Sequence, residues 1–155
     1  MLWFEDFTPG RRFEFAPRPV SASEIIAFAA EFDPQPMHLS ASDGGESILG
    51  GLAASGWHTS AMMMRMLCDS YILDSASEGS PGVDRMEWKK PVLAGDTLSG
   101  SVAVVEARAS KSRPSIGIVR FLGEVRNQRG EIVATCDYIN MIRRKTEGAD
   151  AHAHG

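Results

Sequence analysis

The sequence lacks the residue patterns that mark metal-binding and nucleic-acid-binding proteins. It has only two cysteines, Cys68 and Cys136, which lie in apolar surroundings and do not have the spacing of metal ligands. Its 16 basic residues are scattered and are outnumbered by 20 acidic ones, whereas proteins that contact phosphates cluster their lysines and arginines. We therefore expect free buried thiols, no metal site and no nucleic-acid partner.

Long hydrophobic runs and glycine-rich phosphate loops are also absent. The most apolar stretch, residues 61–68, is too short to span a bilayer and contains Arg65. The first six residues hold no basic region followed by an apolar one, so they do not form a secretory signal. The glycines of residues 50–56 lack the spacing of a dinucleotide fingerprint. We expect a cytoplasmic protein that has no membrane segment and needs no cofactor.

The chain length fits a single domain. Its 155 residues suit one sizeable core, and no internal repeat or linker divides them. We expect the domain to cover residues 1–145, followed by a disordered polar tail over residues 146–155. The histidines of this tail, His152 and His154, are weak candidates for metal ligands.

Hydrophobic periodicity predicts two helices and five strands. Ser21 and Glu24 have the spacing of a capping box, and the helix that they begin ends before Asp33 because a proline follows. A longer helix, from residue 56 to about residue 71, is apolar nearly all round, which indicates that protein surrounds it. The strands are expected at about residues 12–15, 85–89, 98–105, 116–125 and 132–142.

One architecture accounts for all these elements. It is an α+β domain in which an antiparallel sheet wraps around the longer helix. The polar segment over residues 40–51 is expected to be a loop with at most one helical turn. The order in which the strands pair cannot be read from the pattern.

The segment from Asp33 to His38 is the first candidate for chemistry. Two prolines between these residues exclude a helix and stiffen the connection, so that the carboxylate and the imidazole can converge on one point. Aspartate accepts protons and histidine titrates near neutrality, so the pair can hold a water molecule and move protons in both directions. The alternative is that Asp33 only ends a helix and His38 only bonds to a loop carbonyl.

The beginning of the longer helix is the second candidate. Ser55 is a favoured N-cap residue, and the free amides that follow, above all that of Gly56, form a site for negative charge. A thioester oxygen bound there would be stabilised as it becomes an enolate. Trp57 and His58 are further candidates for the same pocket. Plain helix capping by Ser55 and a packing role for His58 are the alternatives.

Three segments together resemble the MaoC-like, (R)-specific enoyl-CoA hydratases, a family with the hotdog fold. The first is the pattern of aspartate, four residues and histidine from Asp33 to His38. The second is residues 51–56 at the start of the helix, and the third is residues 88–98, with a proline–valine and a glycine–aspartate pair. The similarity extends roughly over residues 7–142.

The resemblance implies a hotdog fold, a homodimer or dimer of dimers, and a substrate carried on coenzyme A or another pantetheine carrier. It implies that water adds to a trans-2-enoyl thioester to give a (3R)-3-hydroxyacyl product, or that the reverse dehydration occurs. Asp33 and His38 would activate the water and protonate the α carbon, and the amide of Gly56 would bind the thioester oxygen. Ser55, Trp57 and His58 would contact the substrate. Candidates for contacts with the coenzyme's phosphates are Lys89, Lys90 and Arg65.

Two positions depart from the family pattern, and two other functions stay open. Family hydratases commonly have a histidine where this chain has Ser55, and some have a serine at about Met64. A hotdog thioesterase is disfavoured because residues 56–67 contain no carboxylate and Asp69 comes only near the end of the helix. A non-catalytic acyl-CoA-binding protein would not need the acid–base pair.

Overall fold

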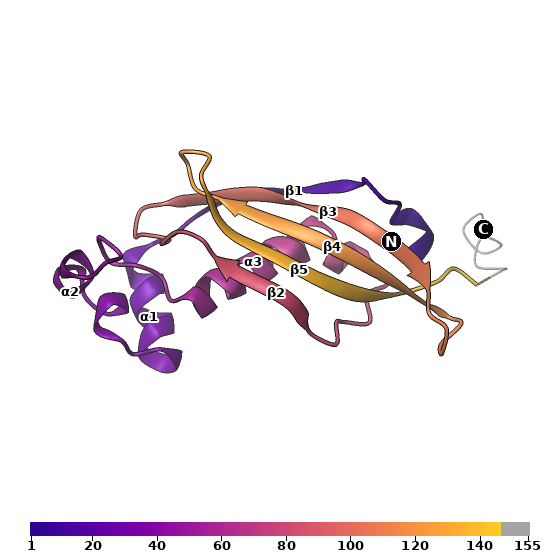
Figure 1. Ribbon diagram of the computed structural model, residues 1–155, viewed down its shortest axis with the longest axis horizontal. Helices are drawn as coiled ribbons and strands as arrows, with labels where there is room; N and C mark the ends of the chain where they lie inside the picture. Colours follow the sequence, from indigo (N-terminus) through magenta and orange to yellow (C-terminus); the bar gives the residue numbers. More distant parts are fainter. Residues whose placement is uncertain (147–155) are drawn as a thin grey trace, which may run out of the picture.

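The computed structural model describes residues 1–146, which form one curved antiparallel sheet with a long helix against its inner face (Figure 1). The strands follow each other across the sheet in the order β1-β3-β4-β5-β2. This arrangement confirms the predicted sheet around a central helix, α3 (Gly56–Ser70). The strands are β1 (Arg12–Pro19), β2 (Val83–Trp88), β3 (Thr97–Ala109), β4 (Ile116–Arg126) and β5 (Ile132–Arg143).

The shorter helices gather at one end of α3, beyond the ends of the strands (Figure 1). Helix α1 (Ala22–Phe32) begins with the predicted capping box, in which Ser21 Oγ accepts the Glu24 amide at 3.2 Å and the Glu24 carboxylate accepts the Ser21 amide at 3.1 Å. The single turn expected between residues 40 and 51 is helix α2 (Ala41–Glu46). Three 3-10 turns complete the fold: Phe4–Asp6, Pro36–His38 and Ile72–Asp74.

Strand β4 shows why the sheet and α3 pack closely. Its side chains alternate, so that Val119, Phe121 and Val125 are fully buried, as predicted. Gly123 lies on the same face, and a side chain there would collide with the terminal methyl group of Met63 from α3. The missing side chain therefore makes room for the helix.

Two predicted strands were too short. Strand β1 extends beyond residue 15 to Pro19, and β3 extends beyond residue 105 to Ala109. The pairing of β1 with β3 shifts register between Phe15 and Arg18, and that of β3 with β4 shifts between Val104 and Glu106. A bulge interrupts the period of two on which the prediction relied, so the predicted strands ended where the bulges begin.

The expectation that protein surrounds α3 was wrong for a single chain. One face of the helix, with Met62, Met63, Met66 and Leu67, is buried, but Trp57 is 66% exposed and Met64 is 49% exposed. The sheet covers only one side of the helix.

None of the helices within residues 1–146 is long and apolar enough to cross a membrane.

A buried network of hydroxyl groups joins the C-terminal end of α3 to β5. The Tyr71 hydroxyl donates to Asn140 Oδ1 at 3.0 Å and therefore accepts from the Tyr138 hydroxyl, 2.9 Å away. Burial and the neighbouring phenol raise the pKa of Tyr71, so the hydroxyl keeps its proton. The network thus places three polar groups in the core with their hydrogen bonds satisfied.

Tyr71→Phe is expected to lower the free energy of unfolding by about 1–3 kcal/mol, because Asn140 Oδ1 then stays buried without its donor. Tyr138→Phe is the matched control. It removes only the donor to Tyr71, so it should cost about 0.5–1.5 kcal/mol. Urea unfolding measures both values, and an equal or larger loss in Tyr138→Phe would contradict this account of the network.

Candidate active site

A cleft of about 570 Å³ opens where the N-terminus of α3 meets the loop that follows α1. Its walls include the Asp33–His38 loop, the end of β2 and the segment that follows β2. The residues that line it are Asp33, Gln35, Met37, His38, Ile48, Leu49, Ala53, Ala54, Ser55, Gly56, Trp57, Thr59, Trp88, Lys89, Lys90, Pro91 and Val92.

The prolines after α1 turn the chain back into this cleft. Asp33 occupies the C-cap of α1, and its carbonyl accepts the Gln35 amide at 2.8 Å, which closes a tight turn. Pro36 begins a 3-10 turn that ends at His38. The loop is therefore short and hydrogen-bonded to itself, which fixes the directions of both candidate side chains.

The structure brings Asp33 and His38 together, as the prolines had led us to expect. Asp33 Oδ2 lies 3.5 Å from His38 Nε2, and the two side chains are only 18% and 7% exposed. His38 Nδ1 lies 2.7 Å from the carbonyl oxygen of Ala53. Because a carbonyl only accepts, Nδ1 carries the hydrogen, and in the neutral ring Nε2 faces Asp33 with a free lone pair.

Both oxygens of the Asp33 carboxylate have a fixed donor. The Ser55 hydroxyl donates to Oδ2 at 2.6 Å, and Gln35 Nε2 donates to Oδ1 at 2.8 Å. The hydrogen bond from Ser55, followed by that from Gln35, lowers the pKa of Asp33, and the nearby His38 adds a smaller effect in the same direction. Asp33 is thus a carboxylate near neutral pH. Gln35 was not among the predicted site residues, and its only signal in the sequence was its place inside the Asp33–His38 motif.

Ser55 occupies the N-cap position of α3, as predicted, but its side chain does not cap the helix. It is fully buried at the edge of the cleft, and within the described chain it makes no hydrogen bond to the first amides of α3. Ser55 lines the cleft, but its hydroxyl hydrogen is directed at Asp33, so its expected contact with substrate stays a prediction.

Gly56 presents its backbone to the cleft beneath an indole ring. The first bond of the helix runs from the Thr59 amide to the Ser55 carbonyl, so the Gly56 amide precedes the helical ladder. A Cβ atom on Gly56 would lie 2.5 Å from Cδ2 of Trp88. Trp88 is held across this turn by a 3.0 Å hydrogen bond from Nε1 to Ser60 Oγ. Trp88 was predicted to lie in a strand, and this contact was not predicted.

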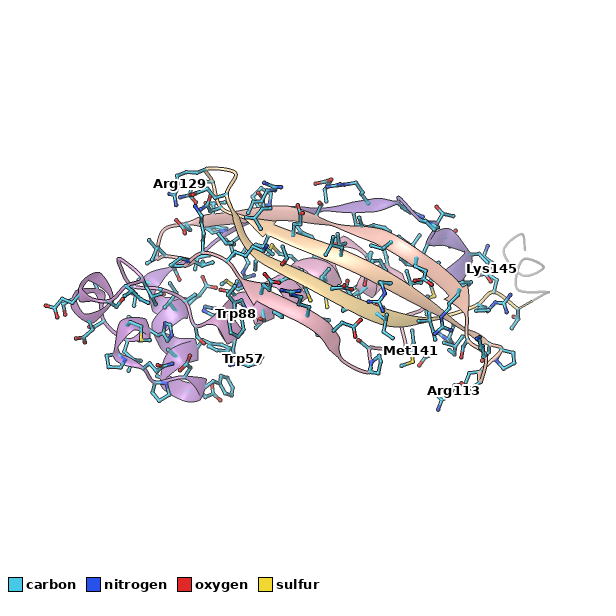
Figure 2. The ribbon with its side chains drawn as sticks, in the orientation of Figure 1. Trp57, Trp88, Arg113, Arg129, Met141 and Lys145 are labelled. Carbon is cyan, nitrogen blue, oxygen red and sulfur yellow. The ribbon has the colours of Figure 1, made fainter. Side chains whose placement is uncertain are left out.

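The two tryptophans of the cleft lie beside each other, Trp57 at the start of α3 and Trp88 at the end of β2 (Figure 2). Their ring centroids are 5.2 Å apart and the rings meet edge to face. Trp57 thus borders the cleft, as the sequence analysis expected for a substrate-contacting residue. Its contact with substrate stays a prediction.

His58 was expected to contact substrate, but the structure places it outside the cleft. Its side chain turns toward α1 and stacks on Phe28, with ring centroids 4.7 Å apart and an interplanar angle of 10°. The residue is 6% exposed, Nδ1 has no hydrogen-bond partner among residues 1–146, and burial lowers the pKa of the ring. His58 therefore packs the helices together as a neutral ring, which corrects the expected role.

The basic residues proposed for phosphate contacts are divided between two places. Lys89 and Lys90 line the cleft, where they also pair with Glu87 and Glu131. Arg65 lies on the exposed side of α3 and pairs with Asp69 at 3.1 Å.

Within residues 1–146, no three potential metal ligands come together. His152 and His154, and all of the predicted tail from residue 147 onward, lie outside the described residues.

Comparison with known proteins identifies both the family and the fold. The family model described as MaoC like domain matches residues 5–124. The crystal structure of the MaoC-like dehydratase from Rhodospirillum rubrum is 41% identical and has a TM-score of 0.87, over 94% of this chain and 99% of that one. An R-hydratase from Pseudomonas aeruginosa shares the fold at 20% identity, with a TM-score of 0.73 over 92% of this chain and 86% of that one. These likenesses confirm the predicted α+β hotdog fold.

A curated relative matches only part of this chain. The mesaconyl-CoA hydratase of Haloarcula hispanica is 40% identical over 76 residues. The match covers 48% of this chain and 21% of that hydratase, so the chain spans a small part of that protein's length. Hydratases and dehydratases thus stand among the relatives by both sequence and structure.

Gly56→Ala is expected to displace the Trp88 indole, because the new Cβ would lie 2.5 Å from the ring. The hydrogen bond from Trp88 Nε1 to Ser60 should break, and the indole N–H resonance of Trp88 should shift in a ¹H–¹⁵N NMR spectrum. Gly45→Ala in α2 is the matched control, because a Cβ there has no atom within 4 Å. An unshifted Trp88 resonance in Gly56→Ala would contradict the described packing.

Proposed function

Because this chain belongs to the MaoC-like domain family, we propose that it adds water to the double bond of a trans-2-enoyl thioester, or catalyses the reverse dehydration. The product of hydration is a (3R)-3-hydroxyacyl thioester. The observation that carries the proposal is the approach of Asp33 Oδ2 to within 3.5 Å of His38 Nε2 in a cleft that also contains Gly56. We propose that a carrier such as coenzyme A binds in the same cleft, where Lys89 and Lys90 would supply positive charge for its phosphates.

The Gly56 amide is proposed to bind the thioester oxygen. It has no acceptor inside the helix, and the N-terminus of a helix favours negative charge. As negative charge moves from the double bond to the thioester oxygen, this amide stabilises the enolate that forms. Loss of one such donor typically costs about 10²–10³-fold in rate.

Asp33 and His38 are proposed to hold the reacting water between them. The Asp33 carboxylate and the lone pair of His38 Nε2 both accept hydrogen bonds, so each can take one hydrogen of the same water. The oxygen of that water then directs a lone pair at the β carbon of the bound thioester. Neither group needs a metal ion to orient the water.

The proton transfers balance without any other reactant. As the water oxygen bonds to the β carbon, His38 Nε2 takes one of its protons, and the electron pair of the double bond moves to the enolate. The imidazolium then returns the proton to the α carbon, and the thioester re-forms. The lowered pKa of Asp33 keeps it a carboxylate, so we propose that Asp33 holds the water and stabilises the imidazolium 3.5 Å away.

An apolar groove of about 500 Å³ shares Trp57 with the cleft and is proposed to receive the acyl chain. Met63, Met64 and Leu67 of α3 form one side, and Met86 of β2 forms the other. Burying an alkyl chain against these side chains would contribute about 0.8 kcal/mol for each methylene group.

The proposal predicts hydration of crotonyl-CoA by the purified protein, seen as loss of the conjugated thioester absorbance without release of free thiol. Asp33→Asn and His38→Gln should each lower kcat/KM by about 10²–10⁴-fold, because each removes one of the groups that move or hold the reacting proton. Their circular dichroism spectra should match that of the unchanged protein.

Asp69→Asn is the matched control for this experiment. Asp69 is the single carboxylate of α3 and pairs with Arg65 on the exposed side of the helix, so hydration should not change. Release of free thiol that depends on Asp69 would instead establish a thioesterase. Saturable binding of thioesters with neither reaction would establish a non-catalytic protein, and full hydration by Asp33→Asn or His38→Gln would remove that residue from the mechanism.

A homodimer is proposed to form along the free edge of the sheet and the exposed side of α3. Strand β2 ends the strand order and has no neighbour on its outer side in the described part of the chain. The nearby Val83 and Met64 are 56% and 49% exposed and also line the apolar groove, so a second copy that covers them would also cover the groove and the acyl chain in it.

Light scattering after size-exclusion chromatography should therefore give twice the mass of one chain. Met64→Lys should shift the protein toward the monomer, because a charge replaces an apolar contact. Leu122→Lys is the control, since Leu122 is similarly exposed, at 43%, but lies on β4 in the middle of the sheet. A monomeric unchanged protein, or equal effects of both changes, would refute this interface.

A further inference from the structure

We infer that Ser55 is a positioning residue. Its one hydroxyl group orients the Asp33 carboxylate and leaves the first amides of α3 without a side-chain cap. Its hydrogen bond holds the Asp33 carboxylate toward His38, and the same bond keeps the hydroxyl away from the amides that begin α3. Those amides are thereby left for the substrate. This inference rests on the proposed function, because it assigns Ser55 a role in that reaction.

The hydroxyl of Ser55 has one hydrogen to give, and Asp33 receives it. The distance from Oγ to Asp33 Oδ2 is 2.6 Å, which is typical of a strong hydrogen bond from a hydroxyl to a carboxylate. Ser55 is fully buried, so bulk water does not compete for this hydrogen. The bond therefore fixes one carboxylate oxygen with little freedom.

Gln35 completes the restraint from the other side. It donates to Asp33 Oδ1 at 2.8 Å, so the carboxylate cannot rotate without losing both donors. The orientation that results keeps Oδ2 directed at His38 Nε2, 3.5 Å away. Gln35 is exposed, whereas Ser55 is buried, so we assign the larger part of the restraint to Ser55.

The other two helix-capping serines behave differently. Ser21 Oγ accepts the Glu24 amide at 3.2 Å, and Ser40 Oγ accepts the Asp43 amide at 3.1 Å. Both therefore cap their helices in the usual way. Ser55 occupies the same position in α3 but bonds to a side chain 22 residues earlier in the sequence. Of the three helices, α3 contributes most directly to the site, and it is the one whose N-cap serine does not cap it.

Ser55→Ala tests the inference, and Ser21→Ala is its matched control. Ser55→Ala should lower kcat for hydration about ten-fold with little change in KM, because the carboxylate loses its orientation while the amide of Gly56 stays available. Removing the donor should also raise the pKa of Asp33 toward the ordinary aspartate value.

The control separates positioning from helix stability. Ser21→Ala removes a true cap, so it should lower the melting temperature and leave kcat and the pH profile unchanged. Gln35→Leu, at an exposed position that puts folding at little risk, should raise the pKa of Asp33 as Ser55→Ala does, but by less. A stability loss in Ser55→Ala with an unchanged kcat and an unchanged pKa of Asp33 would overturn the inference.

A direct titration keeps this test independent of the proposed reaction. The ¹³C resonance of the Asp33 carboxyl group should titrate at a higher pH in Ser55→Ala than in the unchanged protein, with or without substrate. If no enoyl thioester is hydrated but this shift occurs, the proposed function fails while the control of Asp33 by Ser55 is upheld. If hydration occurs but the titration of Asp33 does not move, the inference fails alone.

Discussion

Helix α3 buries its methionine face on the inner side of the sheet, where the missing side chain of Gly123 makes room for Met63. This packing fixes where the helix begins, and the site is built around that beginning. The amide of Gly56, the hydroxyl of Ser55 and the ring of Trp57 all come from this one turn. The chemistry at one end of the helix therefore depends on apolar contacts along the rest of it.

The short contacts between α1 and α3 bring the acid–base pair to that point. Asp33 ends α1 and accepts the Ser55 hydroxyl, while Phe28, farther back in α1, stacks on His58. The two donors fix the direction of the carboxylate and lower its pKa, and burial lowers the pKa of the stacked His58 ring. Polar and aromatic contacts thus set the angle at which the two helices meet.

The fold and the pairing of Asp33 with His38 were within reach of the sequence, because both depend on signals close together in the chain. The capping box at Ser21 spans three residues, and the prolines lie between the two side chains that they orient. The bulges in β1 and β3, and the contacts made by Ser55 and His58, depend on partners far away in the sequence. No local pattern predicts whether the Ser55 hydroxyl bonds to the first amides of α3 or to Asp33. Nor does one predict whether the His58 ring faces the cleft or Phe28.

The indole of Trp88 over Gly56 links two positions that lie 32 residues apart. As long as the tryptophan covers this turn, every residue larger than glycine at position 56 meets the ring, so the two positions are not free to vary separately. A lineage that replaced the tryptophan with a small residue would release the constraint on its glycine partner and widen the entrance beside it. The substrate range of such descendants would then change through substitutions at positions 56 and 88, and neither substitution alters an ionisable residue.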